Sequence, residues 1–300
     1  MKKLTKKCIA ITMAMLVLPA NRAFSMENGT STYPAGALTI YNGIMPEPGT
    51  YINMFNQYLH QNKVVDNDGK KIFDAAISGT GHAIQIVHVF DDLSVAGAHV
   101  AAEIDQTYVN VQFKSKEIGI DTSEGALGDT TLGFRLGWHN KTVHQQFNVK
   151  ATVPTGSNDR DEVLNAGVNY YSALIHYSVT WFPTPNIEAS GEAVGIWNAP
   201  NKDTNYRSGN SINLNYGLNY HFNNGWFAGA GGAWINQIDD DTQNGKSVNG
   251  NGNRMRTFAI GPQAGYVAPG WGAYLAWQHQ AYVRNSAEGD LVWLNFSYKL

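Results

Sequence analysis

The stretch Ser211–Phe222, SINLNYGLNYHF, decides the fold class of this 300-residue chain. Large apolar or aromatic side chains occupy every second position, and small, amide or imidazole side chains occupy the positions between them. A period of two predicts a β-strand with one apolar and one polar face. Strands of soluble proteins usually have ~5–6 residues, whereas a tilted strand that crosses a bilayer needs ~9–11. The stretch therefore favours a strand that spans a membrane.

Similar segments follow one another along the chain. We expect strands at residues 49–60, 80–90, 93–104, 129–140, 142–153, 170–182, 186–197, 210–222, 225–238, 254–267, 270–283 and 289–300. The expected links alternate between short ones, at 91–92, 140–141, 183–185, 223–225 and 269–270, and long ones, at 61–79, 105–128, 154–169, 198–209 and 239–253. Only the link at 284–288 is of intermediate length. This alternation predicts an all-β fold, a transmembrane antiparallel up-and-down β-barrel of about 12 strands, with both termini in the periplasm.

The surface pattern agrees with a membrane location. Aromatic residues lie near the ends of the expected strands, as in the girdles of membrane barrels: Tyr170, Tyr171, Trp181, Trp197, Tyr220, Trp226, Trp271 and Tyr298. The chain ends in an apolar and aromatic strand, Val292–Leu300, of the kind that the barrel assembly machinery recognises in outer-membrane proteins. We therefore expect contacts with outer-membrane lipid and with that machinery.

The N-terminus has the features of a secretory signal peptide, residues 1–25. Four lysines precede an apolar stretch, and Ala23-Phe24-Ser25 resembles a cleavage site. The only cysteine, Cys8, would leave with this peptide, so disulfides and cysteine metal sites are excluded from the mature chain. The signal peptide holds five basic and no acidic residues. Its removal lowers the count from 21 basic and 24 acidic residues to 16 and 24, so the mature chain has a net charge of −8. Such an acidic chain is not expected to bind nucleic acid.

The mature chain divides into an N-terminal segment, residues 26–47, and the barrel, residues 48–300. The segment is rich in Gly and Pro but carries apolar side chains that water would solvate poorly, so we expect a plug inside the lumen rather than a periplasmic tail: Tyr33, Leu38, Tyr41, Ile44 and Met45.

Parity along the strands assigns polar side chains to the lumen. The expected lumen-lining residues are Arg135, His139, His144, Asn148, Lys150, His176, Glu188, Glu192, Asn213, Asn215, Asn219, His221, Gln278 and Gln280. Charges facing lipid would cost ~2–4 kcal/mol at the midplane, which supports this orientation. We expect ion pairs of Glu188 or Glu192 with Arg135 or Lys150; alternatively these groups bond to one another only to fill the barrel.

Several weaker patterns in the sequence also have simpler explanations. His176 and Ser178 lie on one strand face, as in a phospholipase-like barrel, but the expected Asn-Gly is replaced by Val179. The run Gly229–Ala233 predicts either a lateral exit or a strand bend. The acidic loop residues at 66–68 and 239–241 bind divalent cations weakly or are simply solvated. No histidine spacing indicates a catalytic metal, and no motif indicates a cofactor.

The order of short motifs resembles the outer-membrane family named for the meta-pathway of phenol degradation. The matching stretches are 27–29 with Tyr33-Pro34-x-Gly36, Pro46-x-Pro48-Gly49-x-Tyr51, 127–129, 153–156, Asn165-x-Gly167-x-Asn169-Tyr170, 204–210, 261–263 and 288–290. The resemblance implies transport of small hydrophobic, often aromatic, molecules and no enzymatic activity.

We therefore expect a channel for passive uptake of such compounds. Aromatic side chains in the extracellular loops would capture the cargo: Tyr108, Phe113, Tyr170 and Tyr206. Two alternatives remain at this stage. One is a closed barrel with a structural or adhesive role, and the other is an esterase that uses Ser178 activated by His176.

Overall fold

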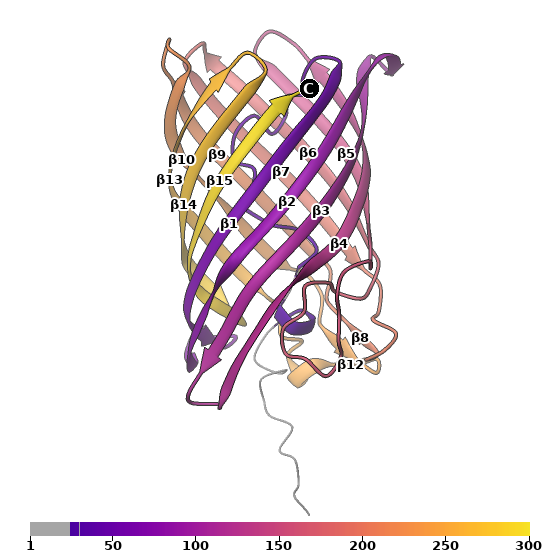
Figure 1. Ribbon diagram of the computed structural model, residues 1–300, viewed down its shortest axis with the longest axis vertical. Helices are drawn as coiled ribbons and strands as arrows, with labels where there is room; N and C mark the ends of the chain where they lie inside the picture. The colour runs from indigo at the N-terminus through magenta and orange to yellow at the C-terminus, as the bar shows by residue number, and fades with distance from the viewer. Residues whose placement is uncertain (1–24, 30) are drawn as a thin grey trace, which may run out of the picture.

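The computed structural model describes residues 25–29 and 31–300, and twelve of its strands form one closed antiparallel barrel. Except for Ser25, the predicted signal peptide lies outside the described residues. The barrel strands are β1 (Gly49–Val65), β2 (Lys71–Val95), β3 (Ala98–Ser115), β4 (Ile120–His139), β5 (Val143–Val153), β6 (Ser172–Thr184), β7 (Ile187–Asn198), β9 (Ser211–His221), β10 (Trp226–Gln237), β13 (Arg256–Ala268), β14 (Trp271–Arg284) and β15 (Ser286–Lys299). Each strand pairs with its neighbour in the sequence, and β1 pairs with β15 to close the ring (Figure 1). The predicted transmembrane barrel is confirmed.

The two ends of the barrel differ. One end carries the short turns and the C-terminus, which marks it as periplasmic. The other end carries the long connections 154–171, 199–210 and 238–255. There, β8 (Tyr206–Arg207), β11 (Thr242–Gln243) and β12 (Lys246–Ser247) form a small sheet beside the barrel mouth (Figure 1). The described helices are the 3-10 turns Glu27–Gly29 and Val248–Gly250. No helix in the described part of the chain is long and apolar enough to cross a membrane.

The first four strands extend far beyond the expected bilayer, and here the sequence prediction was wrong. The expected long loops at 61–79 and 105–128 are instead continuations of β1–β4, closed by the turns 66–70 and 116–119. The expected link at Asp91-Asp92 lies inside β2, which turns into β3 at Ala96-Gly97, both with positive φ. The strands continue because their inward side chains form, with Ala287 of β15, a buried cluster at the extracellular end of the lumen: Val64, Phe73, Ala75, Ile77, Phe113 and Ala287.

The N-terminal segment enters from the extracellular end, so the expectation that both termini are periplasmic was also wrong. The Ser25 amide and hydroxyl both donate to the Asn285 carbonyl, in the extracellular turn between β14 and β15. From there the segment passes through the barrel to Gly49, where β1 begins at the periplasmic end (Figure 1). The segment therefore crosses the whole lumen.

The outer surface is apolar and aromatic. Outward side chains such as Phe134, Leu218 and Leu275 are more than half exposed in the isolated chain, which indicates contact with lipid. Exposed Trp181, Tyr220, Trp226, Trp271 and Tyr298 surround the periplasmic end. Among the aromatic residues expected in the girdles, Tyr170 is the exception because it is buried.

Candidate functional site in the barrel lumen

A buried ion cluster lies on the wall formed by β3, β4 and β5. The Glu103 carboxylate, fully buried, forms an ion pair with the Arg135 guanidinium and lies 3.0 Å from the Lys150 ammonium. The Lys150 ammonium is also 3.3 Å from the Asp105 carboxylate. The expected pairing of Arg135 or Lys150 with Glu188 or Glu192 was therefore wrong. Both cations instead pair with Glu103 on the nearby strand β3. Glu103 lay inside the expected strand 93–104, but it was not among the expected lumen-lining residues.

Glu192 on β7 organises a second cluster. Its carboxylate accepts a hydrogen bond from the Tyr33 hydroxyl at 2.6 Å and lies 2.8 Å from Nδ1 of His176. The Ser178 hydroxyl donates to the same carboxylate at 3.4 Å. His176 and Ser178 thus both bond to Glu192 and are almost fully buried, and the Tyr33 ring packs edge-on against His176. This arrangement fixes the N-terminal segment to the wall and lacks the serine–histidine contact of a hydrolase.

Glu188 on the same strand holds the next part of the segment. Its carboxylate lies 2.6 Å from Nε2 of His221 and accepts the Tyr41 amide at 2.8 Å. The Tyr41 ring stacks on the His221 ring with centroids 5.4 Å apart. Ser190 completes the cluster by donating to Glu188 at 2.5 Å.

Polar side chains of β5, β6, β9, β14 and β15 hold the backbone of the N-terminal segment. Asn215 accepts the Gly36 amide at 2.8 Å, and Thr180 accepts the Gly43 amide at 2.9 Å. The carbonyls of the segment accept hydrogen bonds from Gln278 (to Gly36), Tyr274 and Asn295 (to Ala37) and Gln146 (to Asn42). Buried backbone groups need such partners. The amide-rich inner face therefore replaces the strand pairing that this segment lacks.

The remaining residues expected in the lumen also lie on inward faces. Gln280 bonds to Gln61, and Asn219 bonds to Gln263. Asn148 and Asn213 are buried, as shown by their side-chain exposure of 5% and 1%. His139 and His144 are more accessible, at the periplasmic end, with their Nδ1 atoms 2.8 Å apart.

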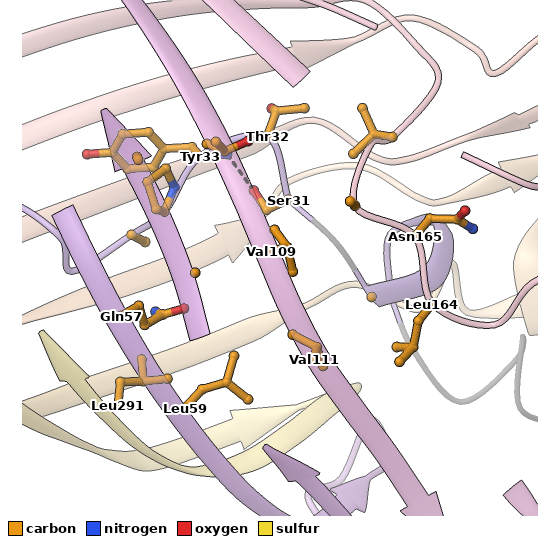
Figure 2. A pocket seen from close by; sticks show the side chains of 18 of the residues that line it. Ser31, Thr32, Tyr33, Gln57, Leu59, Val109, Val111, Leu164, Asn165 and Leu291 are labelled. Atoms are coloured by element: carbon orange, nitrogen blue, oxygen red, sulfur yellow. Dashed lines mark hydrogen bonds between the residues drawn. The ribbon is translucent and has the colours of Figure 1, made fainter. Parts of the chain in front are cut away.

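A cavity of about 380 Å³ lies between the N-terminal segment and the extracellular loops. In Figure 2, Leu59, Val109, Val111 and Leu291 line one region of it, and Gln57 adds a polar edge. The segment contributes Ser31–Tyr33, and the loop before β6 contributes Leu164 and Asn165. Small inward residues on β2, Gly81 and Ala83, leave the room. Pockets of ~300–1,000 Å³ with mostly apolar walls are typical of small-molecule sites.

Val109 and Val111 were not expected in the lumen because residues 105–128 were predicted to form a loop, and Leu59 and Leu291 lay in expected strands but were not assigned to the inner face. Leu59 and Leu291 pair across β1 and β15, and Val109 and Val111 alternate with exposed neighbours on β3. The period of two in Val109-x-Val111-x-Phe113 was the available signal.

The aromatic residues expected to capture cargo are not free loop side chains. Tyr108 and Phe113 belong to β3, where Tyr108 is exposed and Phe113 is buried in the cluster above the lumen. Tyr170 donates to the Ser208 hydroxyl at 3.1 Å, and Tyr206 donates to Asp241 at 2.7 Å. Burial and these bonds indicate that Tyr170 and Tyr206 hold the loops together.

The glycine run of β10 does not interrupt the barrel. Residues 227–236 pair with β9 and β13 without a register shift. The place where Gly231 would carry a Cβ lies 2.9 Å from the Thr39 Cβ. The absent side chain leaves space for the N-terminal segment, and no bulge marks a lateral exit here.

The acidic loop residues bond to protein donors. Asp66 accepts the Asp68 and Lys70 amides at 2.8 and 2.9 Å. Asp240 pairs with Arg254 at 2.7 Å. No group of three or more metal-binding side chains occurs among the described residues.

A comparison with protein families matches residues 61–296 to the family described as "Putative MetA-pathway of phenol degradation". The chain belongs to this family. The resemblance predicted from the sequence is confirmed, because the matched residues cover most of the barrel. A comparison with curated protein sequences gave no match.

The chain is also similar to solved structures of outer-membrane proteins. An outer-membrane channel from Pseudomonas putida F1 is similar at 15% identity and a TM-score of 0.78, over 87% of this chain and 98% of that one. The translocator domain of the autotransporter NalP from Neisseria meningitidis has 10% identity and a TM-score of 0.48, over 85% of this chain and 90% of that one. The CymD monoaromatic hydrocarbon channel has 8% identity and a TM-score of 0.44, over 85% and 89%. The first match establishes an outer-membrane channel fold for this family member.

Proposed function

We propose that the chain is an outer-membrane channel for passive uptake of small hydrophobic or aromatic compounds. The observation that carries this proposal is the cavity of about 380 Å³ inside the barrel, with Leu59, Val111 and Leu291 among its apolar lining residues. A single aromatic ring with short substituents fits such a volume. Gln57 and Gln61 at the cavity wall offer hydrogen bonds to a polar substituent.

The N-terminal segment acts as the plug in this proposal. It is residues 26–47 of the mature chain, and the barrel domain is residues 48–300. The segment closes the route on the periplasmic side of the cavity. Its residues Ala37 and Ile40 pack there against Phe227, Tyr274 and Trp293 of the barrel wall. Cargo that enters from the extracellular side therefore passes only when the segment shifts. The apolar outer face binds outer-membrane lipid, and the C-terminal strand β15 is the signal for the barrel assembly machinery.

The first experiment fills the cavity. Cells that carry Val111→Trp are compared with cells that carry Gln112→Trp, which places the same side chain on the outward face of the same strand. Accumulation of a radiolabelled aromatic hydrocarbon at limiting concentration should fall to the level of cells without the gene for Val111→Trp and stay normal for Gln112→Trp. Normal accumulation in both variants, with equal amounts of folded barrel, would contradict the proposal.

A second experiment locks the plug. The Cβ atoms at Thr39 and at a side chain added to Gly231 lie 2.9 Å apart, slightly below the ~3.5–4.5 Å of a disulfide. Because the mature chain is expected to contain no cysteine, Thr39→Cys with Gly231→Cys should form one defined cross-link. Uptake should be lost under oxidising conditions and return with a reductant, and each single variant serves as a control. Uptake by the oxidised form would show that cargo passes without movement of the plug.

A further inference from the structure

The start of the N-terminal segment is held in a buried polar pocket at the extracellular end. The backbone nitrogen of Met26 lies 2.7 Å from the Asp241 carboxylate, and both residues are nearly inaccessible, at 2% and 0% exposure. Asp241 also accepts the Gly209 amide, the Gln237 side chain and the Tyr206 hydroxyl, each at 2.7 Å. The pocket therefore converges on one carboxylate.

This carboxylate lacks a cation. Among the described residues, no Lys, Arg or His side chain forms an ion pair with Asp241, whereas its neighbours Asp239 and Asp240 pair with Arg207 and Arg254. Burial raises the pKa of Asp241, and the hydrogen bonds that it accepts from neutral donors offset this shift only in part. A buried charge normally has an opposite charge beside it.

Cleavage of the predicted signal peptide would supply that charge. The cleavage pattern Ala23-Phe24-Ser25 ends immediately before Met26. Hydrolysis by a signal peptidase breaks the Ser25–Met26 peptide bond with one water molecule, which leaves a carboxylate on Ser25 and an amine on Met26. An α-amino group has a pKa of ~7.7–8.0 and is mostly protonated at neutral pH.

We propose that the mature chain begins at Met26 and that its α-ammonium group forms a buried ion pair with Asp241. The nitrogen is already within hydrogen-bond distance of Oδ2, so the pair needs no rearrangement of the pocket. The pair fixes the outer end of the N-terminal segment to the loop 238–255. An uncleaved or extended chain has an amide at this position and cannot form it. The inference does not depend on the cargo.

The test measures the identity and the reactivity of the first residue. The intact barrel from outer membranes is analysed by mass spectrometry and then acylated at pH 7 with a water-soluble acetylating reagent. The mature chain should begin at Met26, and its α-amine should react at least tenfold more slowly in the folded than in the unfolded protein. Asp241→Asn keeps the size but removes the charge, and should raise the folded-state rate at least fivefold. Asp240→Asn is the matched control and should leave the rate unchanged.

Two results would overturn the proposal. One is a mature chain that begins at another residue, and the other is equal reactivity of Met26 in the original chain and in Asp241→Asn. If Asp241→Asn fails to fold, an alanine inserted between Ser25 and Met26 keeps Asp241 and moves the amine by one residue. This chain should react like the unfolded protein, and protection equal to that of the original chain would also overturn the proposal.

Discussion

The substitution Glu103→Gln should destabilise the barrel strongly, although it changes one oxygen to a nitrogen. Glu103 is the carboxylate shared by Arg135 and Lys150, and the three side chains are 0%, 12% and 9% exposed. Removal of one partner from a buried ion pair costs about 3–5 kcal/mol, because the remaining charge stays buried without compensation. Lys150 keeps Asp105 at 3.3 Å, whereas Arg135 has no second carboxylate in ion-pair distance among the described residues.

We therefore expect the lower end of this range, about 3 kcal/mol, which is roughly a hundredfold in the folding equilibrium. The assay is reversible urea unfolding of the barrel in lipid vesicles, followed by tryptophan fluorescence. Asp121→Asn removes an exposed pair with Lys114 on the extracellular extension and is the control. It should cost less than about 1 kcal/mol.

A double-mutant cycle separates the ion pair from other effects of the substitution. Glu103→Gln combined with Arg135→Gln removes both charges, so its cost should fall short of the sum of the single costs by at least about 1 kcal/mol. A loss in Glu103→Gln no larger than that in Asp121→Asn would refute the reasoning. Strict additivity in the cycle would refute it as well.

Three further outcomes follow from the described contacts. Gly217→Leu should displace the N-terminal segment, because a side chain there would collide with the Thr39 carbonyl. Gly191→Leu should not, because a Cβ there meets only the Asn215 carbonyl oxygen, at an ordinary contact distance of 3.8 Å. Labelling of Thr39→Cys with a maleimide distinguishes the two variants, and equal labelling would contradict the prediction. Tyr206→Phe should weaken the contact between the extracellular loops 199–210 and 238–255 by about 0.5–1.5 kcal/mol, because one buried hydrogen bond is lost. Protease cleavage of the loop 238–255 should become faster, and an unchanged rate would argue against the prediction. Backbone amides hold the pKa of Asp66 below 3.8, so its turn is stabilised above that pH and loosens as the pH falls through the lowered pKa; an NMR titration with a midpoint at or above 3.8 would disagree.

The barrel could be predicted from the sequence because a strand with lipid on one side and polar groups on the other must alternate. Ser211–His221 lacks long extensions, and its expected bounds agree with β9 within one residue. The bounds of β2 could not be predicted in the same way. In its extracellular half the inward side chains Phe73 and Ile77 pack against other protein groups, and exposed residues such as Asp74 lie between them. A strand whose length is predicted from the bilayer thickness is therefore predicted to end too early.

The site was less predictable because its contacts join distant parts of the chain. Parity assigns Glu192 to the lumen, but only the closed ring brings it beside His176 and Tyr33. The partner of Arg135 depended on the register between β3 and β4, which the sequence pattern does not specify. Loop aromatics such as Tyr206 attracted a functional interpretation, although their hydrogen bonds give them a structural role.

The passage of residues 31–48 through the ring constrains the order in which the molecule is assembled. A ring of twelve strands spaced ~4.8 Å apart and tilted by ~40° has a backbone radius of roughly 12 Å, before side chains narrow it. A folded domain of about 100 residues has a radius of gyration of ~13 Å and cannot be drawn through such an opening. The leading end must then thread as an unfolded chain, or β1 and β15 must join around it. A folded protein fused ahead of Met26 would block the first route, so its arrival at the cell surface would report that the ring closes last.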